Sequence, residues 1–160
     1  MIVFKFQTES DLSEWKIVGD YVMGGVSHGD IRVNDSGNGV FSGTVSLENN
    51  GGFSMVQHFF DTKIVNTFSK TCIRLKGDGK TYQFRIKTHS DDKHSYVANF
   101  NTSGNWETIE IPFSKMIPTF RGKKLDLENY SGNQMEHIAF LIGNKKAETF
   151  KLELDFIELK

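Results

Sequence analysis

Arginine and amide side chains are the residues of this chain whose types and spacing are best suited to hold a ligand. Arg74, Gln83 and Arg85 lie on two neighbouring segments with alternating apolar residues, and Arg121 follows Phe120. A guanidinium can hold a carboxylate or phosphate with two parallel hydrogen bonds, or stack on an aromatic or sugar ring. These four residues form the predicted recognition surface. The alternative is that they are solvated arginines neutralised by nearby carboxylates.

Two glycine-containing segments are the second candidate for binding. Residues 22–27 read Val-Met-Gly-Gly-Val-Ser, and residues 49–52 read Asn-Asn-Gly-Gly. The simpler interpretation is a pair of tight turns, in which glycine supplies dihedral angles that other residues avoid and a nearby aspartate caps the turn. The functional interpretation is that the glycines let a partner's backbone approach, beside an adaptable methionine and two amides. The candidate binding residues here are Asp20, Met23, Gly24, Gly25, Asn49 and Asn50.

Residues that could perform catalysis or bind a metal are scattered. The five histidines form no His-x-His or His-Glu-x-x-His spacing, and Asp91-Asp92-Lys93-His94 is interpreted as a solvated loop. Cys72 lies within a predicted strand, without a histidine that can be placed beside it. We therefore predict no catalytic residues, no metal and no cofactor, and a domain that is not an enzyme. The spacing neither supports nor excludes a structural calcium.

Strands must position the candidate residues, because the apolar side chains recur with a period of two. Segments 82–86, 96–100, 109–113 and 150–156 each place apolar side chains on one face. The phase slips after Phe156, which predicts a β-bulge near that point. Short helical turns are predicted only over 11–15 and 61–65.

The Asp78-Gly79 pair is the strongest turn signal and predicts a type I′ hairpin. This hairpin would bring the candidate arginines onto one face of one sheet. Its register pairs Leu75 with Tyr82, Ile73 with Phe84, Arg74 with Gln83, and Cys72 with Arg85.

Composition limits the class of protein and its partners. The 160 residues fit one domain, residues 1–160, and 14 Phe with 15 Gly and 2 Pro favour short strands joined by tight loops. About ten strands predict an all-β antiparallel sandwich or jelly roll with one or two short helices.

Charge and the chain start limit the partners and the location. A net charge of −1 lacks the basic footprint that nucleic acid requires. No apolar stretch approaches the roughly 20 residues that would insert into a membrane. The first residues contain no basic region and no continuous apolar region, and the chain has a single cysteine. Both features predict a cytoplasmic protein.

Three segments resemble one protein family. Residues 15–27 contain Trp…Asp-x-Val-Met-Gly-Gly-Val-Ser, residues 41–53 contain Phe-x-Gly-x-Val-Ser-Leu-Glu-Asn-Asn-Gly-Gly-Phe, and residues 73–82 continue the likeness. Trp106, Ile111-Pro112-Phe113 and Phe120-Arg121-Gly122 follow in order. From about residue 15 to the end, the chain resembles the CIA30 domain, named for the complex I intermediate-associated protein of about thirty kilodaltons.

The resemblance implies a galactose-binding-domain-like β-sandwich and a role as a chaperone in respiratory complex I assembly. We therefore predict a non-catalytic domain that binds a protein partner, such as a respiratory complex subunit or assembly intermediate. A carbohydrate- or small-ligand-binding module is the alternative, and an uncharacterised enzyme is the third interpretation. A broad apolar patch would favour the first, an aromatic beside amides and charges the second, and converging titratable groups the third.

Overall fold

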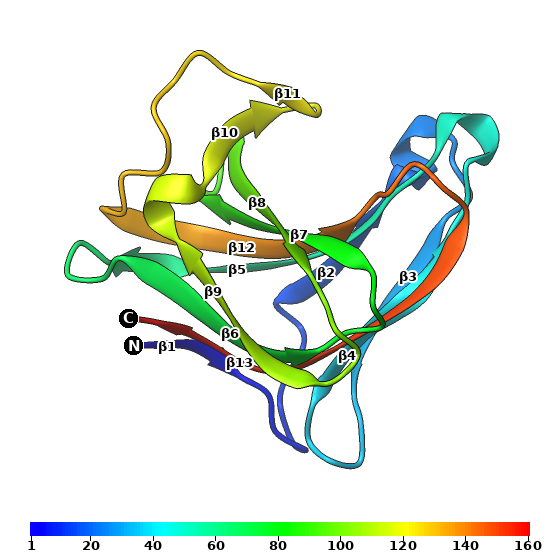
Figure 1. Ribbon diagram of the computed structural model, residues 1–160, viewed down its shortest axis with the longest axis horizontal. Helices are drawn as coiled ribbons and strands as arrows, with labels where there is room; N and C mark the ends of the chain where they lie inside the picture. The colour runs from blue at the N-terminus through cyan, green and yellow to red at the C-terminus, as the bar shows by residue number, and fades with distance from the viewer.

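The computed structural model describes the side chains of residues 1–21 and 24–160 and consists of two facing antiparallel sheets (Figure 1). The six-stranded sheet has the order β3-β4-β13-β6-β9, with β1 paired to β13. Its strands are β1 (Ile2–Lys5), β3 (His28–Val33), β4 (Gly39–Val45), β6 (Lys70–Lys76), β9 (Trp106–Pro112) and β13 (Glu148–Leu159).

The seven-stranded sheet has the order β11-β10-β8-β7-β12-β5-β2. Figure 1 shows β10 and β11 rising above β12 and β5, so this sheet curls away from the other one and its outer face is concave. Its strands are β2 (Trp15–Gly19), β5 (Ser54–Ile64), β7 (Thr81–Lys87), β8 (Ser95–Asn101), β10 (Ile117–Phe120), β11 (Lys123–Lys124) and β12 (Gln134–Ile142).

The hydrophobic core lies between the sheets. Ile73 and Leu75 enter it from β6, and Phe84 and Phe140 enter from β7 and β12, all with no exposed surface. Full burial of one such side chain contributes on the order of 1.5–3 kcal/mol, which is why the two apolar faces stay together. The predicted all-β antiparallel sandwich is confirmed.

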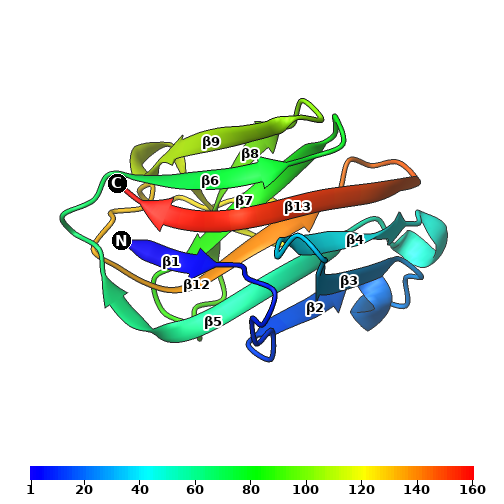
Figure 2. The same ribbon diagram turned by 90° about the horizontal axis from the view of Figure 1, so that it is seen from below.

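The bulge predicted near the end of the last strand is also present. The pairing of β13 with β6 shifts register between Leu154 and Phe156. This shift lets Ile157 and Leu159 return to the core, where both are buried. Figure 2 shows β13 between β6 on one side and β1 and β4 on the other.

Neither predicted helical turn forms a helix: residues 12–15 make a single hydrogen-bonded turn, in which the Trp15 N–H donates to the Leu12 carbonyl at 3.0 Å. Residues 61–64 belong to β5, because Lys63 and Ile64 pair with Met135 and Gln134 of β12. The described helical segments are 3₁₀ turns of three or four residues, and none is long or apolar enough to cross a membrane. They are η1 (Asp20–Met23), η2 (Glu48–Asn50) and η3 (Phe113–Lys115).

The predicted hairpin around Asp78 is wrong. β6 pairs with β13 and β9, whereas β7 pairs with β8 and β12, so residues 77–80 cross from one sheet to the other. A type I′ turn needs positive φ at both central residues, but only Gly79 has it, at 83°. The Asp78 carboxylate instead accepts hydrogen bonds from the Tyr82 hydroxyl at 3.0 Å and from the Lys151 N–H at 2.8 Å. These contacts hold the crossing at the end of the core.

Candidate functional site

The crossing at residues 77–80 separates the arginines that the sequence placed together. Arg74 lies on the outer face of the six-stranded sheet, with its guanidinium carbon 5.7 Å from the centre of the Trp106 ring. Gln83 and Arg85 lie on β7 in the opposite sheet. The predicted single surface of Arg74, Gln83 and Arg85 therefore does not form, although Gln83 and Arg85 are neighbours.

Arg121 lies in the turn between β10 and β11. Its backbone has a φ of 52° and its guanidinium carbon lies 5.2 Å from the centre of the Phe120 ring. The side chain is exposed. β8 lies between β10 and β7 in the sheet, so Arg121 is not on a strand adjacent to that of Arg85.

The outer face of the seven-stranded sheet carries a polar cluster around Arg85, which we call the Arg85 face. It is defined by residues that alternate outward on four adjacent strands and that pair across them. Its members are Gln57 and Phe59 of β5, Gln83, Arg85 and Lys87 of β7, Asn99 of β8, and His137 and Ala139 of β12.

Hydrogen bonds order the amides of this face. Arg85 Nη1 donates to Gln83 Oε1 at 2.6 Å, and Gln83 Nε2 donates to Asn99 Oδ1 at 3.4 Å. Arg85 is half-buried, and this burial lowers the pKa of its guanidinium. A desolvated guanidinium interacts strongly with any anion that reaches it, because little water competes.

His137 lies on the same face, opposite Lys87 in the register and 1% exposed. Its Nε2 lies 3.0 Å from Gln57 Oε1, and its ring centre lies 4.6 Å from that of Phe59. Burial, followed by the positive charges of Lys87 and Arg85, lowers the pKa of His137 to about 3. The imidazole is therefore neutral near pH 7, and the positive charge of this face comes from Arg85 and Lys87.

The second group of predicted residues lies at one end of the sandwich, around the buried carboxylate of Asp20. Ser27 donates to it through its N–H at 3.0 Å and its hydroxyl at 2.5 Å. The N–H groups of Gly52 and Phe53 donate at 2.6 and 3.2 Å. Burial raises the pKa of Asp20, but these hydrogen bonds outweigh it and lower the pKa below its usual value. We call Asp20, Ser27, Ser46, Gly52 and Phe53 the Asp20 network, since the Ser27 hydroxyl also accepts the Ser46 N–H at 2.9 Å.

The glycines and asparagines of this end have conformations that the network requires. Gly24 has a φ of 85°, and Asn49 and Asn50 have φ of 54° and 62°, in the left-handed region that glycine and asparagine tolerate. Gly25 is buried, and a Cβ there would lie 2.5 Å from the Asp20 Cγ. The prediction for Met23 lies outside the described residues.

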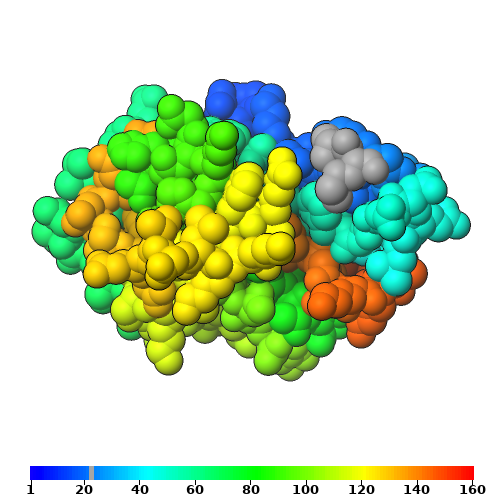
Figure 3. Space-filling view, turned by 90° about the horizontal axis from the view of Figure 1, so that it is seen from above, coloured from blue at the N-terminus to red at the C-terminus, as the bar shows by residue number. Residues whose placement is uncertain are grey.

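Apolar side chains are exposed directly beside the Asp20 network. Tyr21, Val26 and Leu47 are 57%, 39% and 46% exposed, and each adjoins a network residue in sequence. A shallow hollow next to Leu47 is also lined by Gly143 and Lys145. Figure 3 shows this end of the molecule, where the cyan segment around residue 47 meets the orange-red segment around residue 145. We call Tyr21, Val26 and Leu47 the loop-end patch.

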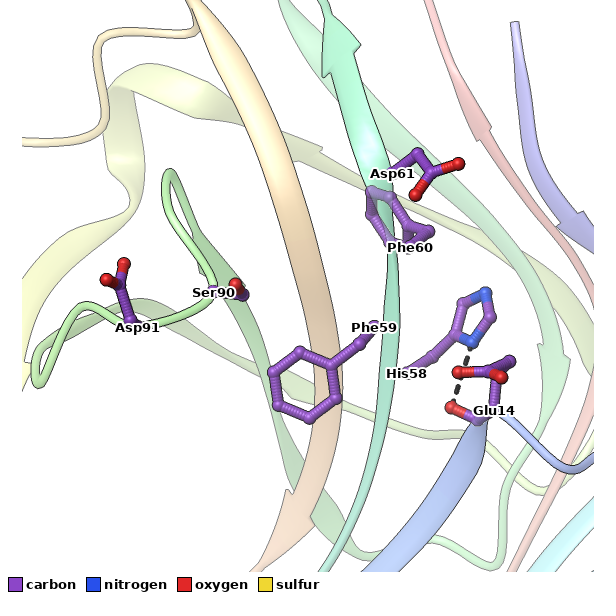
Figure 4. A pocket seen from close by; sticks show the side chains of 7 residues that line it. All are labelled: Glu14, His58, Phe59, Phe60, Asp61, Ser90 and Asp91. Atoms are coloured by element: carbon purple, nitrogen blue, oxygen red, sulfur yellow. Dashed lines mark hydrogen bonds between the residues drawn. The ribbon is translucent and has the colours of Figure 1, made fainter.

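A larger hollow beside β5 does not gather reactive groups at one point. Its lining includes Glu14, His58, Phe59, Asp61 and Asp91. Figure 4 shows His58 and Phe59 pointing to opposite sides of β5, with Asp91 turned away on another segment. His58 Nδ1 lies 3.2 Å from the backbone oxygen of Glu14. Among the described residues, no three His, Cys, Asp or Glu side chains are grouped to hold a metal ion.

Reasoning from the sequence missed several members of the Arg85 face. Lys87 could have been predicted from the sequence, because it continues the two-residue spacing of Gln83 and Arg85 on the same strand. His137, Gln57 and Phe59 carry no such signal. They come from β12 and β5, which join β7 only through sheet pairing.

Comparison with known families gives one match over most of the chain. The model of the family described as Complex I intermediate-associated protein 30 (CIA30) matches residues 4–154.

Curated relatives carry the same description. The protein named "Complex I intermediate-associated protein 30, mitochondrial" of Mus musculus is 24% identical over 179 residues, covering 98% of this chain and 55% of the relative. Its namesake in Drosophila melanogaster is 23% identical over 184 residues, covering 99% of this chain and 62% of the relative. The chain thus spans little more than half the length of these relatives.

These relatives correct the prediction of a cytoplasmic protein, since both are named mitochondrial. The prediction rested on reading the first residues of this chain for a targeting signal. A match to only part of longer relatives removes the basis for that reading.

Solved structures show the same fold at low sequence identity. The family 11 carbohydrate-binding module of the cellulosomal cellulase Lic26A-Cel5E of Clostridium thermocellum has a TM-score of 0.70 at 19% identity, covering 98% of this chain and 92% of that one. The family 11 module from the same organism, in complex with a β-1,3-1,4-mixed-linked tetrasaccharide, has a TM-score of 0.67 at 20% identity, covering 97% and 94%. These matches confirm the predicted β-sandwich fold.

Proposed function

The chain belongs to the CIA30 family, and from this membership we propose that residues 1–160 act as one non-catalytic domain that binds a protein partner during assembly of a larger complex. Relatives named as complex I intermediate-associated proteins support the assembly role, with a respiratory complex subunit or assembly intermediate as the partner.

The observation that carries this proposal is the loop-end patch on its hydrogen-bonded base. Exposed apolar side chains at one end of a sandwich favour protein contact, because burying them in an interface removes them from water. The Asp20 network holds the backbone beneath the patch, so binding costs little ordering of these loops.

Partner capture from the native cell tests the proposal, using the wild-type chain and two matched variants. Leu47→Asp places a charge in the patch, and Leu127→Asp places one at a leucine that is 53% exposed elsewhere. We expect Leu47→Asp to lose the proteins that the wild type retains and Leu127→Asp to retain them. Equal retention by both variants, with unchanged melting temperatures, contradicts the proposal.

A second candidate function is the binding of carbohydrate or another small ligand on the Arg85 face. Three amides and the Phe59 ring lie on a curved sheet surface there, and amides beside an aromatic ring suit hydroxylated ligands. The similar solved structures include carbohydrate-binding modules. Retention on a glycan array, together with no reproducible protein partner, would favour this function over assembly.

A further inference from the structure

We propose that the Arg85 face binds a hydroxylated small molecule that carries a carboxylate or phosphate, such as a sugar acid or sugar phosphate, with the anionic group on Arg85 and Lys87. This inference rests on the second candidate function above and specifies the chemical class of its ligand.

The first observation is a guanidinium without a counter-ion. Among the described residues, no carboxylate lies within 4.0 Å of the Arg85 guanidinium, and its one described hydrogen bond goes to the Gln83 amide oxygen. Arginine has five N–H donors in one plane, so most of them are left for another acceptor. By contrast, two lysines of the other sheet are paired with carboxylates. Lys5 Nζ lies 2.9 Å from Asp155 Oδ1, and Lys70 Nζ lies 2.8 Å from Glu110 Oε1.

The second observation is another cation on the same strand and the same face. Lys87 Nζ donates to the backbone oxygen of Asp92 at 2.7 Å, which satisfies a hydrogen bond without neutralising the charge. Burial and then the charge of Arg85 lower the pKa of Lys87, while Asp92 and Asp91 act in the opposite direction from beyond 4.0 Å. An anion between Arg85 and Lys87 would relieve this repulsion.

The residues that pair with Arg85 across the sheet do not compete for its hydrogen-bond donors. Its neighbours across the sheet are Ala139 on β12 and Val97 on β8, both buried and without hydrogen-bonding side chains. The remaining donors of Arg85 are therefore available for two parallel hydrogen bonds to a carboxylate or phosphate, the geometry in which arginine binds these groups.

The rest of the face fits the uncharged part of the ligand. The amides of Gln57, Gln83 and Asn99 offer donors and acceptors to hydroxyl groups, and Phe59 offers a ring face. Two cations within a chain of net charge −1 match one anionic group, not the repeated phosphates of nucleic acid.

The test is a titration of the full chain followed by amide chemical shifts in NMR, which detects weak binding. The probes are glucuronate, glucose 6-phosphate, glucose and inorganic phosphate. The proteins are the wild type, Arg85→Gln, Lys87→Gln, and Arg74→Gln as the matched control on the opposite sheet. Melting temperatures establish that each variant is folded.

We expect an acidic sugar to bind more tightly than glucose and to shift amides of β7 and β12. Arg85→Gln should weaken this binding about tenfold or more, since hydrogen bonds to charged groups are the strong ones. Lys87→Gln should weaken it less, and Arg74→Gln should not change it.

Three results would overturn the inference. If glucose binds as tightly as the acidic sugars, the face binds sugars but has no anion site. If Arg74→Gln weakens binding as much as Arg85→Gln, the site is elsewhere. If none of the four probes shifts the β7 amides, the ligand-binding role of this face is itself wrong, whereas the assembly proposal still stands on the partner-capture experiment.

Discussion

The carboxylate of Asp20 accepts a hydrogen bond of 2.6 Å from the backbone N–H of Gly52, 32 residues further along the chain. The two residues belong to two of the sequence blocks that resemble the CIA30 family. One buried acid therefore fixes both loops at this end of the sandwich.

We expect Asp20→Asn to lower the free energy of unfolding by about 2–4 kcal/mol. The NH₂ group of the asparagine would face the N–H and O–H donors of the Asp20 network, which now donate to a carboxylate oxygen. Urea denaturation at pH 7 measures the change. Asp30→Asn, at an exposed aspartate on β3, is the control and should change stability by less than about 0.5 kcal/mol. A loss for Asp20→Asn no larger than for Asp30→Asn would show that the Asp20 network does not hold the loops.

Two adjacent glycines should respond differently to alanine. Gly24 has a φ of 85° with nothing within 4 Å of an added Cβ, so Gly24→Ala should cost only the backbone strain, about 1–2 kcal/mol. An added Cβ at Gly25 meets the Asp20 carboxylate and must displace it. Gly25→Ala should therefore cost more than Gly24→Ala in thermal or urea unfolding. The reverse order would mean that Asp20 moves aside without losing its hydrogen bonds.

Stability should fall below about pH 6.5 because of His137. Its pKa is about 3 in the folded protein and about 6.5 in the unfolded chain, so only the unfolded chain takes up a proton between these values. The stabilisation is complete above pH 6.5 and is lost by up to about 1.4 kcal/mol per pH unit as the pH falls toward 3.

Urea denaturation at pH 7.5 and pH 5.0 checks this, comparing wild type with His137→Gln. Between these pH values the wild type should lose about 2 kcal/mol more than the variant. Burial also lowers the pKa of His58, but that residue is present in both proteins. Equal losses would mean that His137 is protonated in the folded protein. The Asp20 contribution is lost only below about pH 4, outside this window.

Replacing Arg85 with an uncharged side chain should not destabilise the protein. Arg85→Met removes a half-buried charge that has no counter-ion among the described residues, and it should raise stability by about 1 kcal/mol. Arg74→Met removes the guanidinium over Trp106 and should lower stability by about 0.5–1 kcal/mol. Melting temperatures of both variants measure the difference. A clear loss for Arg85→Met would make Arg85 a structural residue.

The fold could be predicted from local patterns, because the alternation of apolar and polar residues is visible in the sequence of each strand. Tyr82, Phe84 and Ile86 point into the core as their spacing predicts. The slip after Phe156 marked the bulge for the same reason, since each residue added to a strand reverses the facing of those that follow. The prediction of a short helical turn at 61–65 was wrong, because strand pairing with β12 outweighed a weak local preference for helix.

The grouping of the candidate residues was decided only by the tertiary structure. Alternation is satisfied equally when two strands lie side by side in one sheet and when they face each other across the core. Leu75 and Tyr82 meet that condition in both arrangements, but Arg74 and Arg85 share a face only in the first. The crossing at residues 77–80 placed them on opposite sheets, and the pairing of β7 with β12 brought His137 beside Lys87 instead. Side-chain facing is a property of one strand, whereas a binding site depends on which strands become neighbours.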